Sequence, residues 1–358
     1  MGKQVKTPRF YVDMPTFLHA TGQLGWDNSE GGAELLYMNC SNPYTTETQT
    51  EIELTPFSIG SSTNNTPKTS FPINFCALLN HNLASNIEDF KIIGKHGLTS
   101  TATSETLFPS NEILNSNPNG EYINPTYNGT TIFDFTSDDQ YWKSFEIYYD
   151  NTNPIDIGTH QLGSMVVGKY WDAPNSPDMS LTMSRRFDGI KRQKTIGGKT
   201  LANIYYDGPT EWTMNGPDGV YKYPPFELDL ATTDATDGDT FNARAKSGLG
   251  RKGLKSWKLT FSYISESDMW MANETSNTII ADDTTTTNND PNPMLSDDSF
   301  NFVWNCTLGG TLPFIFQPDN TNNNPDNFSI CTFRENTLSV TQQAHNVYKL
   351  SITIDEVA

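Results

Sequence analysis

Histidines, cysteines and carboxylates are the residue types that can do chemistry in this chain, and none of them forms a known catalytic or metal-binding pattern. The five histidines and four cysteines lack the short spacings of zinc ligands, and no Gly-x-Ser-x-Gly nucleophile elbow occurs. The segment from Gly197 to Thr200 matches the end of a phosphate-binding loop, but the upstream glycine and a following helix are missing. We therefore predict a hairpin turn there, in a protein that is not an enzyme and holds no metal or cofactor.

Carboxylates are abundant, and two uses of them stay open at this point. The two carboxylates of a glycosidase face each other across a cleft at roughly 5–10 Å, and spacing along strands does not reveal such a pair. The acidic loop from Asp229 to Asp239 offers oxygen ligands to calcium, although it lacks the Asp-x-Asp-x-Asp-Gly pattern of an EF-hand. A solvated acidic face is the interpretation that we favour for both.

The charge balance restricts the partners of the protein. The chain carries 23 basic and 42 acidic residues, a formal net charge of -19 at pH 7. A charge of this sign repels the phosphates of nucleic acids and of anionic lipids, so neither nucleic acid nor membrane is an expected partner. No apolar run approaches the roughly 18 residues that span a bilayer, and the N-terminal residues do not form a signal peptide. The sequence predicts a soluble protein made in a cytoplasm.

Two groups of side chains are candidates for binding. Exposed aromatic rings on loops stack on sugars, whereas most aromatic residues of a β-sandwich belong to its core. The candidate sugar-binding residues are Trp26, Tyr141, Trp142, Tyr170 and Trp171. A basic group in so acidic a chain predicts a subunit interface with an acidic patch on another copy, with ordinary surface charge as the alternative. The members of this basic group are Arg185, Arg186, Lys191, Arg192 and Lys194.

Alternating apolar and polar residues place these candidates on or between β-strands. Residues 141–149 alternate in this way, and a polar turn follows them at residues 150–154. Residues 71–83 form an apolar run typical of a central strand buried on both faces, and residues 256–264 alternate cleanly. The sequence therefore predicts an all-β protein with two β-sandwich (jelly-roll-like) domains and long loops.

The length of 358 residues allows two cores, because single cores usually stop growing near about 250–300 residues. Residues 172–178 contain two prolines among polar residues and are typical of an extended spacer. We predict an N-terminal, discoidin-like β-sandwich over residues 1–172 and a C-terminal β-sandwich over residues 173–358.

The ends of the chain give further local predictions. Residues 8–20 indicate an extended opening, and residues 265–271 begin with a capping pattern that favours a helix. Apolar residues alternate over 300–306 and over 349–355, which predicts two strands. Three cysteines in apolar segments are expected to be small buried hydrophobes, namely Cys76, Cys306 and Cys331.

Several segments resemble structural proteins of tailed-bacteriophage virions. In the first half the chain resembles the discoidin-like (galactose-binding-like) jelly-roll module of phage tail proteins, in residues 74–85, 141–147, 157–158 and 162–163. In the second half it is similar to minor tail proteins in which a second β-sandwich follows the first, in residues 195–198, 255–261, 312–319 and 355–357. Together these segments are distributed along most of the chain.

The resemblance implies a structural virion component, namely a tail-tip, baseplate or fibre-attachment protein that assembles as a symmetric oligomer. The implied partners are other copies of the chain and other virion proteins. Two alternatives stay open, a tail protein that binds host surface glycans and a capsid decoration protein. No loop of this chain matches a sugar-binding loop of the family, so no binding residue is transferred.

Overall fold

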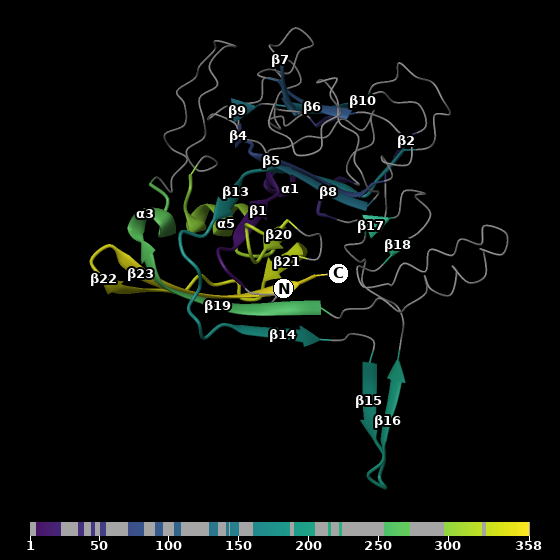
Figure 1. The fold of residues 1–358 in the computed structure, drawn as a ribbon, viewed down its shortest axis with the longest axis vertical. Coiled ribbons are helices and arrows are strands. Elements are labelled where there is room, and N and C mark those ends of the chain that lie inside the picture. The colour runs from purple at the N-terminus through teal and green to yellow at the C-terminus, as the bar shows by residue number, and fades with distance from the viewer. Residues whose placement is uncertain are drawn as a thin grey trace, which may run out of the picture.

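The computed structural model of the protein shows antiparallel β-sheets with a few short helices (Figure 1), which confirms the predicted all-β class. The structure describes the following residues: 5–22, 35–38, 44–46, 51–54, 71–81, 90–95, 104–108, 129–134, 141–142, 144–149, 160–186, 190–204, 214–215, 222–223, 254–272, 297–323 and 327–357.

The largest sheet has eight strands, all paired antiparallel. Its strands are β1 (Arg9–Val12), β13 (Tyr170–Asp172), β14 (Thr182–Arg186), β19 (Leu254–Ser265), β20 (Phe314–Gln317), β21 (Ser329–Phe333), β22 (Val340–Ala344) and β23 (Val347–Glu356). They lie in the order β13-β1-β20-β21-β23-β19-β14, with β22 paired to β23 outside this path.

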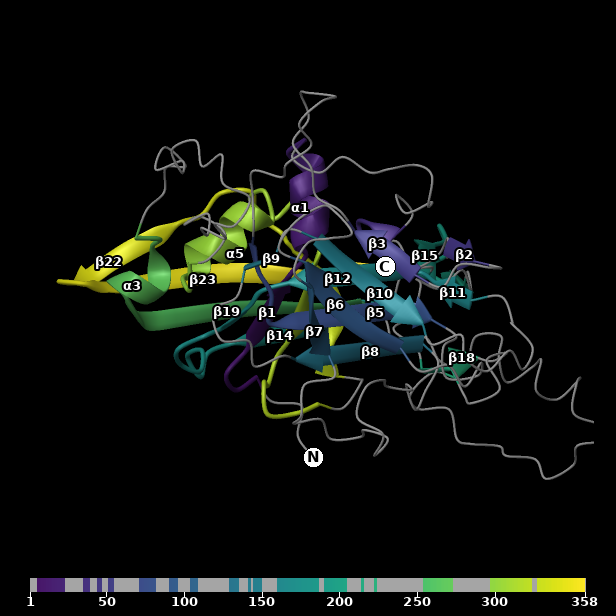
Figure 2. The ribbon, with the colours of Figure 1, turned by 90° about the horizontal axis from the view of Figure 1, so that it is seen from above.

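The remaining strands form smaller sheets, seen from above in Figure 2. A three-stranded sheet contains β12 (Ser164–Gly168), β5 (Phe75–His81) and β8 (Gly129–Asp134), with β5 in the middle. A four-stranded sheet contains β3 (Glu51–Leu54), β10 (Ser144–Tyr149), β6 (Phe90–Lys95) and β7 (Ser104–Phe108). Four strand pairs complete the set: β2 (Tyr44–Thr46) with β11 (His160–Leu162), β4 (Phe71–Pro72) with β9 (Tyr141–Trp142), β15 (Ile190–Lys194) with β16 (Thr200–Ile204), and β17 (Met214–Asn215) with β18 (Lys222–Tyr223).

Strand β5 confirms the predicted central strand. The strand is central because β12 pairs with one edge and β8 with the other. Every side chain from Phe75 to Leu79 is fully buried, since Cys76 and Leu78 pack into one hydrophobic cluster and Phe75, Ala77 and Leu79 into another. A strand that is buried on both faces has a continuous run of apolar residues in its sequence, and this segment has that pattern.

The large sheet combines strands from both predicted domains. β1 lies between β13 and β20, and Phe10 is paired with Trp171 on one side and with Phe316 on the other. The predicted spacer at residues 172–178 does not run free, since the Asp178 amide donates to the Thr260 carbonyl oxygen at 2.7 Å. The predicted boundary therefore does not coincide with a division of this sheet, and the two-domain arrangement is not confirmed.

Strand β19 follows its predicted alternation only as far as Phe261. Trp257, Leu259 and Phe261 are buried as expected, but Tyr263 is 76% exposed and Ile264 is fully buried in its place. The pairing with β23 shifts register between Phe261 and Ile264, and a β-bulge of this kind turns the following side chains to the opposite face.

The helices correct two sequence predictions and confirm one. Helix α3 (Glu266–Met269) begins where a helix was predicted, with the Ser265 hydroxyl accepting from the Asp268 amide. Helix α1 (Met14–Ala20) occupies part of the predicted extended opening. Helix α5 (Phe300–Cys306) replaces a predicted strand, because its mostly apolar side chains are buried around a whole turn and also produce an alternating pattern.

Arg9 connects the large sheet to the three-stranded sheet. Its guanidinium donates two hydrogen bonds to Asp172 of β13, at 2.7 and 2.8 Å, and one to Asp134 of β8, at 2.7 Å. The guanidinium carbon also lies 3.8 Å from the centre of the Tyr170 ring. The Arg9 side chain is only 14% exposed, so these contacts form in a largely dehydrated position.

Replacing Arg9 with alanine is expected to lower the free energy of unfolding by about 2–4 kcal/mol. Removing one partner of a buried ion pair costs about 3–5 kcal/mol, and the partial exposure of both aspartates reduces that cost. The variant Arg9→Lys is expected to retain only part of the lost stability, because lysine cannot make the bidentate hydrogen bond to Asp172. Urea unfolding measures the difference. The control is Arg334→Ala, which removes an ion pair to Asp355 in which the arginine side chain is 55% exposed; a loss as large as that of Arg9→Ala would contradict the special role of Arg9.

Candidate functional site

A two-stranded hairpin, residues 190–204, projects from the body of the protein, and we call it the arm (Figure 1). Its strands β15 and β16 are paired at five positions, from Ile190 opposite Ile204 to Lys194 opposite Thr200. All side chains from residue 191 to residue 202 are exposed. An isolated two-stranded hairpin is at best marginally stable in water, so its geometry is suited to contact with a partner surface.

The tip of the arm is an ordered turn. The Thr195 amide donates to the Lys199 carbonyl oxygen at 2.8 Å, and the Gly198 amide donates to the Thr195 carbonyl oxygen at 2.9 Å. The Thr195 hydroxyl accepts from the Lys199 amide at 3.0 Å. Gly198 has a φ of +80°, which favours glycine at this position. The hairpin turn predicted for the Gly-Gly-Lys-Thr segment is thereby confirmed.

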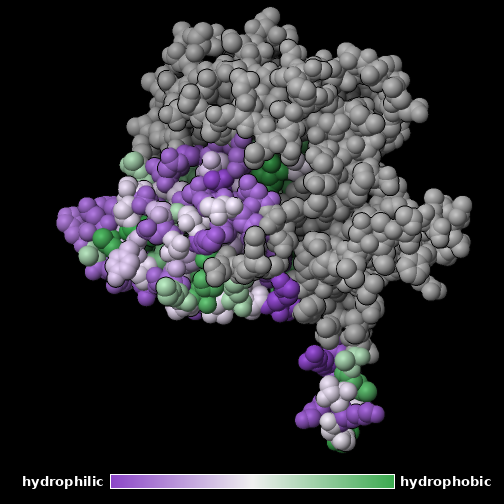
Figure 3. Space-filling view, viewed as in Figure 1, coloured by the Kyte–Doolittle hydropathy of each residue, from purple (hydrophilic) through white to green (hydrophobic). Residues whose placement is uncertain are grey.

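The arm carries positive charge and exposed apolar side chains together. Its basic residues are Lys191, Arg192, Lys194 and Lys199, and it contains no acidic residue. Without these four, the chain would hold 19 basic against 42 acidic residues. Ile196 at the tip is fully exposed and Leu201 is 51% exposed. Figure 3 shows hydrophilic and hydrophobic residues side by side on this projection.

The structure places the predicted basic group on two consecutive strands. Arg185 and Arg186 are exposed on β14, at the edge of the large sheet, where β14 pairs only with β19 among the described strands. Lys191, Arg192 and Lys194 are exposed on β15 of the arm. The predicted group is thus divided between a sheet edge and the arm, and its assignment to a subunit interface stays a prediction.

The predicted sugar-binding aromatics do not form a common surface among the described side chains. Trp171 is 4% exposed, packs on Phe10 and Phe300, and donates its indole N–H to the Asp298 carbonyl oxygen at 2.9 Å. Its role is therefore corrected to that of a core residue, because its ring packs between Phe10 of β1 and Phe300 of α5. Tyr170 is half-buried under the Arg9 guanidinium. The other members lie outside the described residues or side chains: Trp26, Tyr141 and Trp142.

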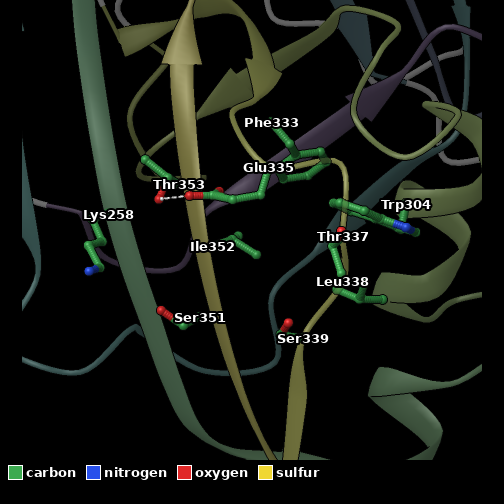
Figure 4. Close-up of a pocket in the computed structure, with 10 residues that line it drawn as sticks. All are labelled: Lys258, Trp304, Phe333, Glu335, Thr337, Leu338, Ser339, Ser351, Ile352 and Thr353. Carbon is green, nitrogen blue, oxygen red and sulfur yellow. Dashed lines mark hydrogen bonds between the residues drawn. The ribbon is translucent and has the colours of Figure 1, made fainter.

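A surface pocket of about 190 Å³ lies between α5, the segment after β21, and strands β19 and β23 (Figure 4). Its apolar wall consists of Trp304, Phe333, Leu338 and Ile352, and the rings of Trp304 and Phe333 are 5.3 Å apart. Sequence reasoning missed this pocket. Trp304 was placed on a predicted strand, and the spacing of the other residues carries no signal that would bring them together.

Two charged residues line the same pocket. Glu335 is exposed, and its carboxylate accepts a hydrogen bond from the Thr353 hydroxyl at 3.1 Å. Lys258 comes from β19, and Figure 4 shows it across β23 from Trp304 and Leu338. The pocket therefore offers a negative charge and a positive charge at separate positions around an apolar wall.

The described residues do not gather into a metal-binding arrangement. No group of three or more His, Cys, Asp or Glu residues that can hold a metal ion occurs among them. Burial lowers the pKa of His81 to about 3, and its ring lies 2.7 Å from the Thr131 hydroxyl. His81 is thus a hydrogen-bonded structural residue, as predicted. The thiols of Cys76, Cys306 and Cys331 are free and buried, and burial raises their pKa.

Comparisons with known proteins leave the arm and the pocket as the main guides to function. No protein family, curated protein or solved structure matches the chain. Among the described residues, no helix has the length and apolar character needed to cross a membrane. The fold and the site together define an all-β protein with a projecting basic arm.

Proposed function

We propose that the protein is a non-enzymatic structural component of a tailed-phage virion that assembles as a symmetric oligomer through its arm. The observation that carries the assembly role is the arm itself, an ordered hairpin whose described side chains lie in solvent. A hairpin of this kind gains stability when a partner buries its exposed apolar side chains. The arm therefore has a physical reason to bind another protein surface.

A second copy of the chain is the partner that the charges favour. The arm is positive throughout, and the rest of the chain holds more than twice as many acidic as basic residues. Complementary charges steer association and fix the orientation of two surfaces more than they add affinity. The exposed Ile196 and Leu201 supply the apolar contact that charges alone do not give.

The virion context rests on the sequence resemblance to phage tail proteins. A tail-tip, baseplate or fibre-attachment position fits a protein that forms a closed ring of identical copies. The alternatives are a capsid decoration protein, which would bind capsid proteins, and a glycan-binding tail protein. The latter has less support, because Trp171 is buried and Tyr170 is covered by Arg9.

Shortening the arm is expected to dissociate the oligomer without unfolding the protein. In the variant, residues 194–200 are replaced by Asn-Gly, so that Gln193 and Leu201, already paired, flank a two-residue turn. Light scattering over a range of concentrations should give a defined oligomer for the wild type and a monomer for the variant. The melting temperature of the body should be unchanged. Lys349→Glu, at an exposed position on β23, is the control for altered charge and should assemble normally.

Two results would contradict the assembly role of the arm. The first is a wild-type protein that stays monomeric at every concentration. The second is a shortened-arm variant that assembles as the wild type does. Assembly of the wild type should also weaken as the salt concentration rises, because exposed charges are screened.

A further inference from the structure

The pocket beside Trp304 is too small for a typical ligand but large enough for one side chain. Pockets that bind small molecules usually have volumes of about 300–1,000 Å³, whereas this one measures about 190 Å³. One side of the pocket is apolar, where Leu338 and Trp304 are partly exposed to solvent, and polar or charged residues line the rest. Pockets that receive a single apolar anchor are frequent at the centres of protein interfaces.

We infer that Ile196 at the tip of the arm inserts into the Trp304 pocket of a second copy, with Lys199 beside Glu335. This inference rests on the proposed function and adds to it the acceptor surface and the orientation of the contact. Ile196 is a fully exposed apolar residue of the arm, and the hydrogen-bonded turn presents it at the outer end of the hairpin. Little conformational freedom is then lost when it enters a pocket.

The glycines after Ile196 keep the tip narrow. A side chain added at Gly197 would meet no atom within 4 Å in this chain, and Gly197 does not have a positive φ. The fold of the arm therefore favours glycine at position 198, where φ is +80°, but does not require it at position 197. A contact with a confined pocket on another molecule explains the narrow tip.

The charges of the tip and the pocket set the orientation in which the arm docks on the second copy. Lys199 follows the glycine pair and lies opposite the end of β15. Glu335 is exposed at the pocket and attracts it, whereas Lys258 on the other side of β23 repels it. One attractive and one repulsive contact together select a single docking direction.

The contact must join two molecules. The arm points away from the body in Figure 1, so its tip does not reach the pocket of its own chain in this conformation. The two surfaces differ from each other, so copies can join head to tail in a heterologous contact, or two copies can exchange arms around a two-fold axis. Heterologous contacts generate rings when the rotation closes, in agreement with a symmetric oligomer.

Disulfide trapping tests the contact directly. Two single variants, Ile196→Cys and Leu338→Cys, are mixed and oxidised, and the linked dimer is detected by its mass and by its peptides. The described native cysteines are buried. Met179→Cys, at a fully exposed position, replaces Leu338→Cys in the control mixture. We expect a dimer linked through positions 196 and 338; a yield no higher than that of the control mixture would overturn the inference.

Two further variants separate this inference from the proposed function. Gly197→Tyr should leave the melting temperature unchanged and raise the dissociation constant of the oligomer by about tenfold or more, because the added ring blocks the pocket. Glu335→Lys should weaken assembly, and Lys199→Glu in the same chain should restore it. Dissociation by the shortened arm with no effect of Gly197→Tyr or Glu335→Lys would overturn the pocket contact and leave the proposed function standing. A monomeric wild type would overturn both.

Discussion

Replacing Phe10 with alanine is expected to lower the free energy of unfolding by about 3–5 kcal/mol, the range for truncating a buried phenylalanine. Phe10 is fully buried on β1, the second strand from one edge of the large sheet. Its ring centre lies 5.2 to 6.2 Å from the centres of five other aromatic rings, those of Trp171, Phe300, Phe314, Phe316 and Phe333. These rings come from separate segments, so they cannot all move inward to fill the cavity.

Urea unfolding followed by tryptophan fluorescence measures the effect of Phe10→Ala. Tyr263→Ala on β19 is the matched control, since Tyr263 is an aromatic residue in the same sheet but 76% exposed. Its cost should stay within about 0.5 kcal/mol, as for most surface substitutions. Equal costs for the two variants would show that the ring cluster around Phe10 is not the centre of the core.

Asp13 is expected to make the protein more stable in mild acid than in mild alkali. Burial raises the pKa of Asp13 to about 7, against hydrogen bonds from the Thr16 hydroxyl and amide that lower it. In the unfolded chain the pKa lies near 3.8, so the folded state binds the proton more tightly. The stabilisation of the folded state by protonated Asp13 is fully present below about pH 4 and is lost as the pH rises to about 7. The total loss is roughly 4 kcal/mol, since each unit of pKa difference corresponds to about 1.4 kcal/mol.

Asp13→Asn tests this pH dependence while it keeps the cap of helix α1. Asparagine caps a helix about as well as aspartate, and its amide does not titrate. We expect the variant to be more stable than the wild type at pH 8 and the difference to shrink towards pH 5, as measured by urea unfolding at each pH. Comparing the variant with the wild type at each pH removes the effect that the net charge of -19 has on the stability of both proteins. A difference that stays constant with pH would show that Asp13 does not titrate in this range.

Much of the local structure could be predicted from the sequence. The alternation in β19 and β23 and the apolar run in β5 specify strands, because side chains of a strand point to opposite faces. The Gly-Gly turn of the arm and the cap of α3 also follow from local chemistry. The segment Phe300–Cys306 was predicted wrongly, since seven mostly apolar residues fit a buried strand and a buried helix equally well.

The candidate site was predicted only in part. Three basic residues of the arm, Lys191, Arg192 and Lys194, were predicted by their contrast with an acidic chain, but Lys199 and the projection of the arm into solvent were not. The pocket joins Trp304, Glu335 and Lys258 from three distant segments. The spacing of these residues in the sequence does not indicate that they are neighbours, because the pairing of distant strands brings their segments together.

Sequence patterns alone specified the all-β class, the acidic charge, the turn of the arm and the positions of several strands, among them β5, β19 and β23. Tertiary structure alone decided which strands are neighbours. β1 pairs with β13 and with β20, and Arg9 and Tyr11 bond to residues 163 and 306 positions away, Asp172 and Gln317. An alternating pattern specifies which face of a strand is apolar, but it does not specify the partner strand. The choice of partner strands depends on packing between distant segments. The resulting arrangement buries Trp171 and leaves the arm exposed.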